Sequence, residues 1–180
     1  IKNDNLIEII ENSKNSNFKP LKMISTNVDG KKCEAYAYNE VSIMRQTHLA
    51  SKIQININNE IKMKELICDG VLVSTSAGST AYNLSAHGSI LPLDSNILAL
   101  TPISAFRPRR WRGALLSETN KIELFIIDNK ERSSSVTADN IEFRNIEKVE
   151  IESSNENICT VLFDSKHSIE DKILNEQFKY

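Results

Sequence analysis

Short runs in which apolar and polar residues alternate constrain the fold of this chain more than any other feature of its sequence. Residues 32–38 and 51–57 follow a period of two, as strands with one buried face do. Residues 71–75 are almost continuously apolar, which predicts a strand covered on both faces. Asn58 and Asn59 follow the second run and are typical of a hairpin turn. Further runs of strand character lie at 121–127, 134–138, 148–152 and 158–163.

Many short strands with little helix between them predict a mainly β fold, an antiparallel two-layer β-sandwich, rather than a doubly wound sheet. Helical patterns lie near the two ends of the sequence. Residues 5–13 form a short amphipathic helix, which a polar break at 12–17 ends. We therefore expect three parts: a helix and linker at 1–17, a β-sandwich at 18–165 and a C-terminal helix at 166–180. Both terminal helices are expected to dock onto something else.

The composition excludes several function classes. The 180 residues contain 22 lysines and arginines against 24 aspartates and glutamates, so a net charge of -2 attracts neither nucleic acid nor an anionic membrane. The three cysteines and three histidines lack the spacing of a metal site, and we predict none in this chain. Three free thiols indicate a reducing compartment, the cytoplasm. No apolar run approaches the ~20 residues of a membrane span, so we expect no membrane partner.

The densest cluster of unusual residues lies at 69–86, where an acidic residue and a buried strand precede a loop of small residues and a helix start. Small residues let a ligand approach the backbone, and free N–H groups at a helix start favour a phosphate. Tyr82 offers a flat face for a base, and Thr80 and Ser85 offer hydroxyls. A serine- and threonine-rich turn that caps the helix through Ser79 or Thr80 explains the same pattern. The local sequence alone therefore does not name the ligand.

Three blocks, in order, resemble the NAD kinase family. Residues 38–43 contain its Asn-Glu pair, 69–85 follow its pattern DGxxVSTPTGSTAYxxS with the match continuing to residue 92, and 100–108 carry its TPI and RP sequences. The arginine-rich continuation at 109–113 resembles the alphaproteobacterial branch, and the similarity extends from about residue 21 to residue 163. One departure is Ser76-Ala77, which stands where the family has Pro-Thr; without proline's fixed φ the loop is expected to be less rigid.

A second departure is that the sequence contains no Gly-Gly-Asp-Gly block, which in the family supplies the catalytic aspartate and part of the ATP site. The resemblance therefore implies no catalytic residue in this chain. It also implies that an α/β domain precedes this sequence, that residues 1–17 link the two domains, and that the terminal helices dock on that domain.

The resemblance assigns an NAD site as a set. Its members are Asn39, Glu40, Asp69, Ala77, Thr80, Ala81, Tyr82, Asn83, Leu84 and Ser85, with Asp139 in a less specific turn. Asn39 and Glu40 would hold the adenosine end of NAD, since an amide beside a carboxylate serves both donors and acceptors. A turn before the strand at 41–44 is the alternative for this pair, and a solvent-exposed β-turn is the alternative for Asp139.

The remaining roles follow the same resemblance. Thr80, Ala81 and Tyr82 would line the adenine site, and Ser85 would face the same side one helical turn after Ala81. Asp69 would accept hydrogen bonds from a ribose, with the nicotinamide ribose of NAD held by a neighbouring subunit as one candidate. Leu84 is expected to pack into the core.

The function implied by the resemblance is transfer of the γ-phosphoryl group of ATP to the 2′-hydroxyl on the adenosine ribose of NAD. ATP with a divalent metal ion, Mg²⁺, and the substrate NAD are the implied ligands, and self-association as a dimer or tetramer is expected. Phosphoryl transfer depends mainly on positioning and electrostatic stabilisation, so a domain that holds the acceptor supplies half of the mechanism. The alternatives are a non-catalytic NAD(P)-binding module and the C-terminal domain of a related lipid-type kinase.

A basic patch, formed by the arginines at 107, 109, 110 and 112 around Trp111, combines cationic and aromatic side chains as nucleic-acid sites do. It is a single short patch in a chain of net charge -2, and nucleic-acid domains usually show a wider basic face. A subunit contact, a polyanionic ligand and a solvated surface remain as interpretations, and we expect no nucleic-acid partner.

Overall fold

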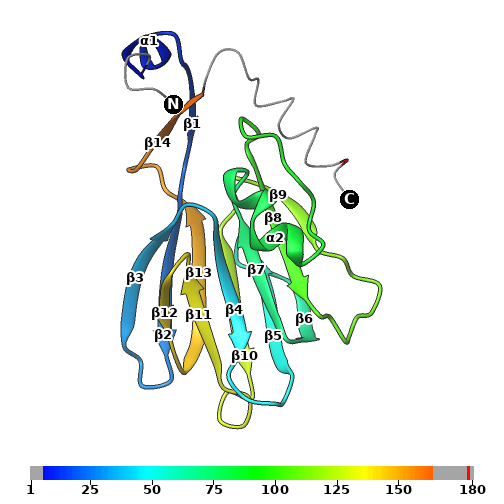
Figure 1. Cartoon of the computed structure of the whole chain (residues 1–180). Helices are drawn as coiled ribbons and strands as arrows, with labels where there is room; N and C mark the ends of the chain where they lie inside the picture. The colour runs from blue at the N-terminus through cyan, green and yellow to red at the C-terminus, as the bar shows by residue number, and fades with distance from the viewer. Residues whose placement is uncertain (1–5, 164–177, 179–180) are drawn as a thin grey trace.

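The computed structural model describes residues 6–163 and residue 178, and most of these residues belong to antiparallel strands (Figure 1). The helical elements are α1 (Leu6–Glu11), the 3₁₀ helix η2 (Ala77–Thr80) and α2 (Tyr82–Ser85). The strands are β1 (Lys14–Phe18), β2 (Leu21–Asn27), β3 (Lys32–Ala37), β4 (Glu40–Arg45), β5 (Ser51–Ile57), β6 (Glu60–Cys68), β7 (Gly70–Ser74), β8 (Ile97–Ile103), β9 (Ala114–Ser117), β10 (Ile122–Ile127), β11 (Ser134–Ala138), β12 (Ile141–Phe143), β13 (Ile146–Ser153) and β14 (Cys159–Phe163).

Two six-stranded sheets form the body of the molecule. One has the order β3-β2-β13-β10-β5-β6, and the other has the order β12-β11-β4-β7-β8-β9. The hydrophobic core contains residues of both sheets, such as Met23 and Leu124 from the first and Val41 and Val136 from the second. Alternating burial along β2 and β5 places every second side chain in this core. The predicted two-layer antiparallel β-sandwich is therefore confirmed.

Strand β7 is buried on both faces, as its continuous apolar run predicts. All five of its residues are buried, and Val71 and Val73 belong to the core between the sheets. Leu72 points the other way, because side chains alternate along a strand, and it is also fully buried. The short helices η2 and α2 contact β7 and cover this outer face. The small-residue loop after β7 is thereby fixed against the sheet.

The hairpin between β5 and β6 turns at Asn58 and Asn59, as predicted. Both asparagines have positive φ, at 52° and 65°. Two consecutive residues with positive φ are the requirement of the tight hairpin turn that matches the twist of a sheet.

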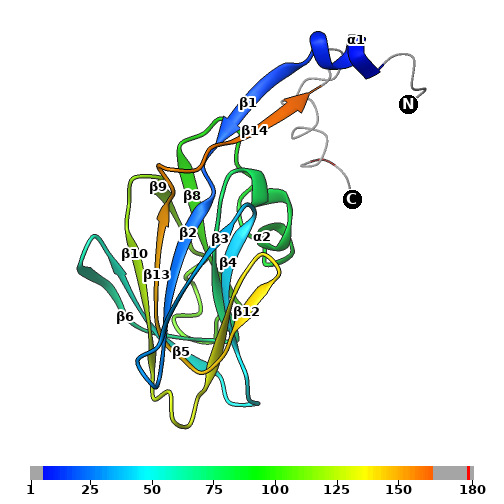
Figure 2. The ribbon, with the colours of Figure 1, turned by 90° about the vertical axis from the view of Figure 1, so that its left-hand side faces the viewer.

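Helix α1 ends at Glu11, where the predicted polar break begins, but Lys14–Phe18 of that stretch form strand β1, which pairs with β14 and was not predicted. Figure 2 shows this pair leaving the sandwich as an arm, with α1 at its far end. All residues of β1 and β14 are exposed or half-buried, so neither strand has a buried face to produce an alternating pattern. The predicted helix at 166–180 lies outside the described residues, apart from Phe178.

Candidate functional site

The turn at residues 38–40 and the loop after β7 form one structural unit. Strands β4 and β7 are antiparallel neighbours, and their register pairs Glu40 with Ser74. The backbone N–H of Thr75 donates to the carbonyl of Asn39 at 2.9 Å, and the Thr75 hydroxyl donates to the carbonyl of Tyr38 at 2.7 Å. A Cβ atom at Gly78 would collide with the Asn39 carbonyl, so only glycine fits there without movement. The loop after β7 is thus held against the 38–40 turn by hydrogen bonds to the backbone of that turn.

Asp139 holds the same turn from the opposite side. Its Oδ2 accepts a hydrogen bond from the backbone N–H of Tyr38 at 2.6 Å, and its Oδ1 accepts from Asn39 at 3.0 Å and from Glu40 at 3.2 Å. The N–H of Asp139 donates to the carbonyl of Glu40 at 3.1 Å. Both carboxylate oxygens therefore accept from backbone donors, and Asp139 orients the backbone of residues 38–40.

One side-chain oxygen of Glu40 receives no hydrogen bond from the described residues. Its Oε2 is buried and has no hydrogen-bond partner among the residues that the structure describes. Burial, together with the negative charge of Asp139, raises the pKa of the Glu40 carboxyl group above its ordinary value. Buried polar atoms in folded proteins normally have partners, so this oxygen is suited to a hydroxyl or amine donated by a ligand.

Tyr82 is the first residue of α2, which lies against β7 on the outer face of the second sheet. Its hydroxyl is 3.6 Å from the sulfur of Met44, and the residue is 36% exposed. Burial raises the pKa of its phenol, and the charges of Glu40 and Asp69 raise it further. Both carboxylates thus act on one ring, although each lies near a different end of the strand.

Asp69 stands directly before β7 and forms an ion pair that sequence reasoning did not predict. The Nε of Arg45 donates to its Oδ1 at 2.6 Å, while Nη1 of Arg45 donates to the carbonyl of Thr47 at 2.6 Å. Arg45 stands five positions after Glu40 in β4, about 17 Å away in an extended strand. The candidate site is therefore elongated, with an acidic residue near each end and an aromatic ring between them.

Asn83 supports the loop from inside. It is fully buried, its Nδ2 donates to the carbonyls of Ser79 at 3.0 Å and Ser89 at 2.9 Å, and its Oδ1 accepts from the Thr101 hydroxyl at 2.7 Å. The expectation that Leu84 packs into the core is wrong, because Leu84 is 37% exposed. In this short helix, the buried side chain is the amide of Asn83, which forms hydrogen bonds with residues of three other segments.

The side chains of Ser79 and Thr80 do not cap a helix, since neither η2 nor α2 has a side-chain cap hydrogen bond. The buried hydroxyl of Ser79 instead donates to the carbonyl of Ser76 at 2.7 Å and accepts from the N–H of Leu91 at 3.0 Å. It ties the loop to the segment that returns to β8. Of these two residues, Thr80 is the one exposed on the surface.

The other predicted site residues lie on the surface of this unit. Thr80 and Ser85 are exposed, whereas Ala77 and Ala81 are half-buried. The N–H of Ala81 donates to the carbonyl of Gly78 at 2.9 Å, so it is already used within the loop. Thr80 and Ser85 thus offer hydroxyls, and Ala81 offers its methyl group.

A cavity of 300 Å³ lies between α2 and the segment that follows β8. Tyr82, Ser85 and His87 line one side, and Arg109, Trp111 and Arg112 line the other. Residues of the sequence-predicted site and of the basic patch therefore line the same cavity.

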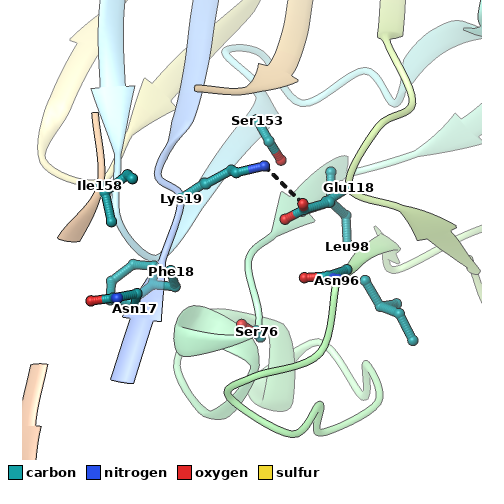
Figure 3. Close-up of a pocket in the computed structure, with 10 residues that line it drawn as sticks. Asn17, Phe18, Lys19, Ser76, Asn96, Leu98, Glu118, Ser153 and Ile158 are labelled. Carbon is teal, nitrogen blue, oxygen red and sulfur yellow. Dashed lines mark hydrogen bonds and ion pairs between the residues drawn. The ribbon is translucent and has the colours of Figure 1, made fainter. Parts of the chain in front are cut away.

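A second cavity, of 230 Å³, lies where the arm joins the sandwich (Figure 3). Figure 3 shows Lys19 and Glu118 directed toward one another, with Nζ donating to Oε1 at 2.9 Å. The charges of Lys19 and Glu118 balance, and Ser76, in the loop after β7, also lines this cavity. None of the predicted NAD-site residues lines it, which makes it a weaker candidate for a dinucleotide.

Within residues 6–163 and at residue 178, no group of three or more histidine, cysteine or acidic side chains could hold a metal ion. Burial raises the pKa of the Cys68 thiol to about 12, which leaves it protonated and unreactive. The same residues contain no helix of the length and apolar character that crossing a bilayer requires.

Comparison with protein families and sequences extends the similarity over most of the chain. A family model described as the ATP-NAD kinase C-terminal domain matches residues 38–163. An NAD kinase of Hyphomonas neptunium is 47% identical over 177 residues, which are 98% of this chain and 69% of that protein. An NAD kinase of Rickettsia bellii is 49% identical and one of Xylella fastidiosa strain Temecula1 is 48% identical, over 97% and 98% of this chain and 68% of each relative.

Two solved structures share the fold. Yeast NADH kinase complexed with NADH has a TM-score of 0.83 and 19% identity, over 98% of this chain and 52% of that one. An NAD kinase from Archaeoglobus fulgidus in complex with ATP has a TM-score of 0.72 and 22% identity, over 89% of this chain and 61% of that one. At these identities the likeness concerns the fold alone, and it agrees with the predicted β-sandwich.

Proposed function

This chain belongs to the NAD kinase family, and from that premise we propose that it holds the acceptor in an ATP-dependent NAD kinase. The reaction moves the γ-phosphoryl group of ATP to the 2′-hydroxyl on the adenosine ribose of NAD, which gives NADP. The observation that carries the proposal is the unit formed by the 38–40 turn, the loop after β7 and Asp139, with an oxygen of Glu40 that has no partner among the described residues.

The chemistry of this unit suits the adenosine end of a dinucleotide. The amide of Asn39 and the carboxylate of Glu40 can serve donors and acceptors of a ribose or a base. Tyr82 offers its ring to adenine, with Thr80 and Ser85 beside it, as base-binding sites use aromatic side chains. Ala77 and Ala81 keep the approach to the backbone open because they are small.

The length of the site also suits a molecule with two nucleotide ends. Asp69 lies near the opposite end from Glu40, and we assign it to a second ribose, either of the same NAD or of an NAD held by a neighbouring subunit. Its Oδ1 is engaged by Arg45, while its Oδ2 accepts no hydrogen bond from the described residues. That oxygen remains for a ribose hydroxyl.

Asp139 acts in this proposal as a positioning residue. Phosphoryl transfer requires the acceptor hydroxyl to be held in line with the donor, and small displacements are costly. By accepting from three consecutive N–H groups, Asp139 holds the backbone from which the side chains of Asn39 and Glu40 project. Asn83 does the same for the loop, through the carbonyls of Ser79 and Ser89.

The donor side lies outside these residues in our proposal. The sequence has no Gly-Gly-Asp-Gly block, and we assign no catalytic residue to the chain. ATP would bring a divalent ion, Mg²⁺, which neutralises phosphate charge when bound. Among the described residues, no cluster of three histidine, cysteine or acidic side chains could hold that ion.

We also propose how the chain is divided into domains, how it assembles and where it acts. We assign residues 18–165 to the NAD-binding sandwich, residues 1–17 to a connection with an α/β domain, and residues 166–180 to a helix that docks on that domain. A dimer or tetramer in the cytoplasm fits the inter-subunit assignment of Asp69 and the free thiols of Cys33, Cys68 and Cys159.

Calorimetric titration of NAD into the full-length protein and into Glu40→Ala tests the assignment. We expect the wild type to bind NAD and Glu40→Ala to bind it about tenfold or more weakly, since a hydrogen bond to a charged group is worth about 1.5–3 kcal/mol. Glu142→Ala is the control, because Glu142 pairs on the surface with Arg144. Equal affinity of Glu40→Ala would remove Glu40 from the site, and phospholipid binding without NAD binding would favour a lipid-type kinase.

A further inference from the structure

The cavity beside α2 has an unbalanced positive charge. Arg109 and Arg112 line it, and the remaining lining residues include no aspartate or glutamate. Neither arginine forms an ion pair within the described part of the chain, whereas Arg45 and Arg144 each pair with a carboxylate. The whole chain carries a net charge of -2, so this positive charge is a local feature.

An aromatic ring contacts Arg109, and a second one anchors the segment that carries both arginines. The guanidinium of Arg109 lies 5.4 Å from the centre of the Phe106 ring, a cation–π contact that leaves its N–H edges available. Trp111 lines the same cavity and also packs against the hydrophobic core. Trp111 therefore anchors the segment that carries Arg109 and Arg112.

The cavity opens onto the proposed acceptor site. Tyr82 and Ser85, which we assign to NAD, form its other wall together with His87. Its volume of 300 Å³ lies at the low end of the roughly 300–1,000 Å³ of small-molecule sites, which suits a part of a ligand rather than a whole dinucleotide.

We propose that this cavity is an anion subsite, in which Arg109 and Arg112 bind the pyrophosphate of the dinucleotide whose base lies on Tyr82. Guanidinium groups match phosphate oxygens with paired N–H donors, and such charge-assisted bonds are stronger than neutral ones. The inference rests on the proposed function for the identity of the dinucleotide. The preference for a phosphate rests on the cavity itself, which Arg109 and Arg112 line and no acidic residue does.

The test compares the double variant Arg109→Gln/Arg112→Gln with Arg110→Gln in the full-length protein. Arg110 is exposed in the same segment but does not line the cavity, so it is a matched control. Calorimetry would measure the binding of NAD, inorganic pyrophosphate and adenosine, which carries no phosphate. We expect the double variant to bind NAD and pyrophosphate about tenfold or more weakly and to bind adenosine as the wild type does. Arg110→Gln should resemble the wild type throughout.

Unchanged NAD and pyrophosphate affinity in the double variant would overturn the proposal. An equal loss of adenosine affinity would also overturn it, because the arginines would then act through the shape of the site. A smaller mass of the double variant in light scattering, with ligand affinity kept, would make the patch a subunit contact instead. Loss of pyrophosphate binding in a protein whose wild type does not bind NAD would refute the proposed function but keep the phosphate site.

Discussion

The Oδ1 atom of Asp139 lies 3.0 Å from the backbone nitrogen of Asn39, one hundred residues earlier in the chain. The contact joins the end of β11 to the turn before β4, which are neighbouring strands. A single side chain thereby orders the backbone from which two proposed NAD-binding side chains project. Replacing Asp139 therefore tests whether the turn has to be held for NAD to bind.

Asp139→Asn should lower both stability and NAD affinity. The amide offers one acceptor oxygen, and its NH₂ group would face backbone N–H donors. We expect the free energy of unfolding to fall by about 1–3 kcal/mol in urea titrations, with weaker NAD binding by calorimetry. Asp128→Asn is the control, because Asp128 also has positive φ but pairs with Lys52 on the surface. Wild-type NAD affinity in Asp139→Asn would contradict the positioning role.

Gly78→Ala should separate the loop from the 38–40 turn. Its new Cβ would meet the carbonyl of Asn39, so one of the two segments must move. We expect a loss of NAD affinity together with a stability loss of about 1–3 kcal/mol, as for other overpacked positions. Gly30→Ala introduces a methyl group into open space at a φ of 78° and should affect stability alone. If both variants bind NAD equally well, the contact at Gly78 does not shape the site.

Glu40→Gln should increase stability at neutral pH while it weakens NAD binding. Because the pKa of Glu40 is raised above 4.5 in the folded protein, the folded state binds more protons than the unfolded chain just above that pH. Stability therefore falls as pH rises through the window between 4.5 and the raised pKa. The glutamine removes this cost, so urea titrations should show a larger gain at pH 7 than at pH 4. A loss of stability at pH 7 would contradict this account of the carboxylate.

Tyr82→Ala should weaken NAD binding by roughly 1–3 kcal/mol if the ring stacks on adenine. Tyr82→Phe keeps the ring and removes only the hydroxyl, whose neighbour in the structure is the sulfur of Met44. Calorimetric titration should therefore give nearly wild-type affinity for the phenylalanine variant. An alanine variant with unchanged affinity would remove Tyr82 from the site.

Asn83→Ala and Leu84→Ala should differ sharply in stability, although the residues are adjacent. The first leaves the carbonyls of Ser79 and Ser89 and the Thr101 hydroxyl without their partner, at a cost of about 1–3 kcal/mol for each buried group that stays unpaired. The second removes a partly exposed side chain. Thermal unfolding of the two variants measures the difference, and a larger loss for Leu84→Ala would contradict the burial of the amide.

The sequence predicts elements whose pattern is local and misses those whose cause is distant. Strand β5 alternates because one face meets the core, and β7 is apolar throughout because η2 and α2 cover its outer face. Strand β1 shows neither pattern, since it is exposed and gains its hydrogen bonds from β14, whose Phe163 pairs with Lys14. No local window of sequence contains that information.

The candidate site also has features that the local sequence predicts and features that depend on distant contacts. The motif at 69–86 and the Asn-Glu pair stand out in the sequence because their residue types are unusual together. The ion pair of Arg45 with Asp69 depends on the register of β4 and β7, and the burial of Asn83 in place of Leu84 depends on partners outside its helix. Asp139 resembles an ordinary turn residue until the fold brings it to Asn39.

Synthesis of NADP by the full-length protein tests the central claim most directly. With ATP labelled at the γ-phosphate, Mg²⁺ and NAD, we predict that the label appears on the 2′-hydroxyl of the adenosine ribose, as read by ³¹P NMR and by an NADP-specific dehydrogenase. Asn39→Ala and Glu40→Ala should reduce this rate by about tenfold or more, while Glu142→Ala should not. A wild-type protein that binds NAD but forms no NADP, or undiminished synthesis by both site variants, would contradict the account.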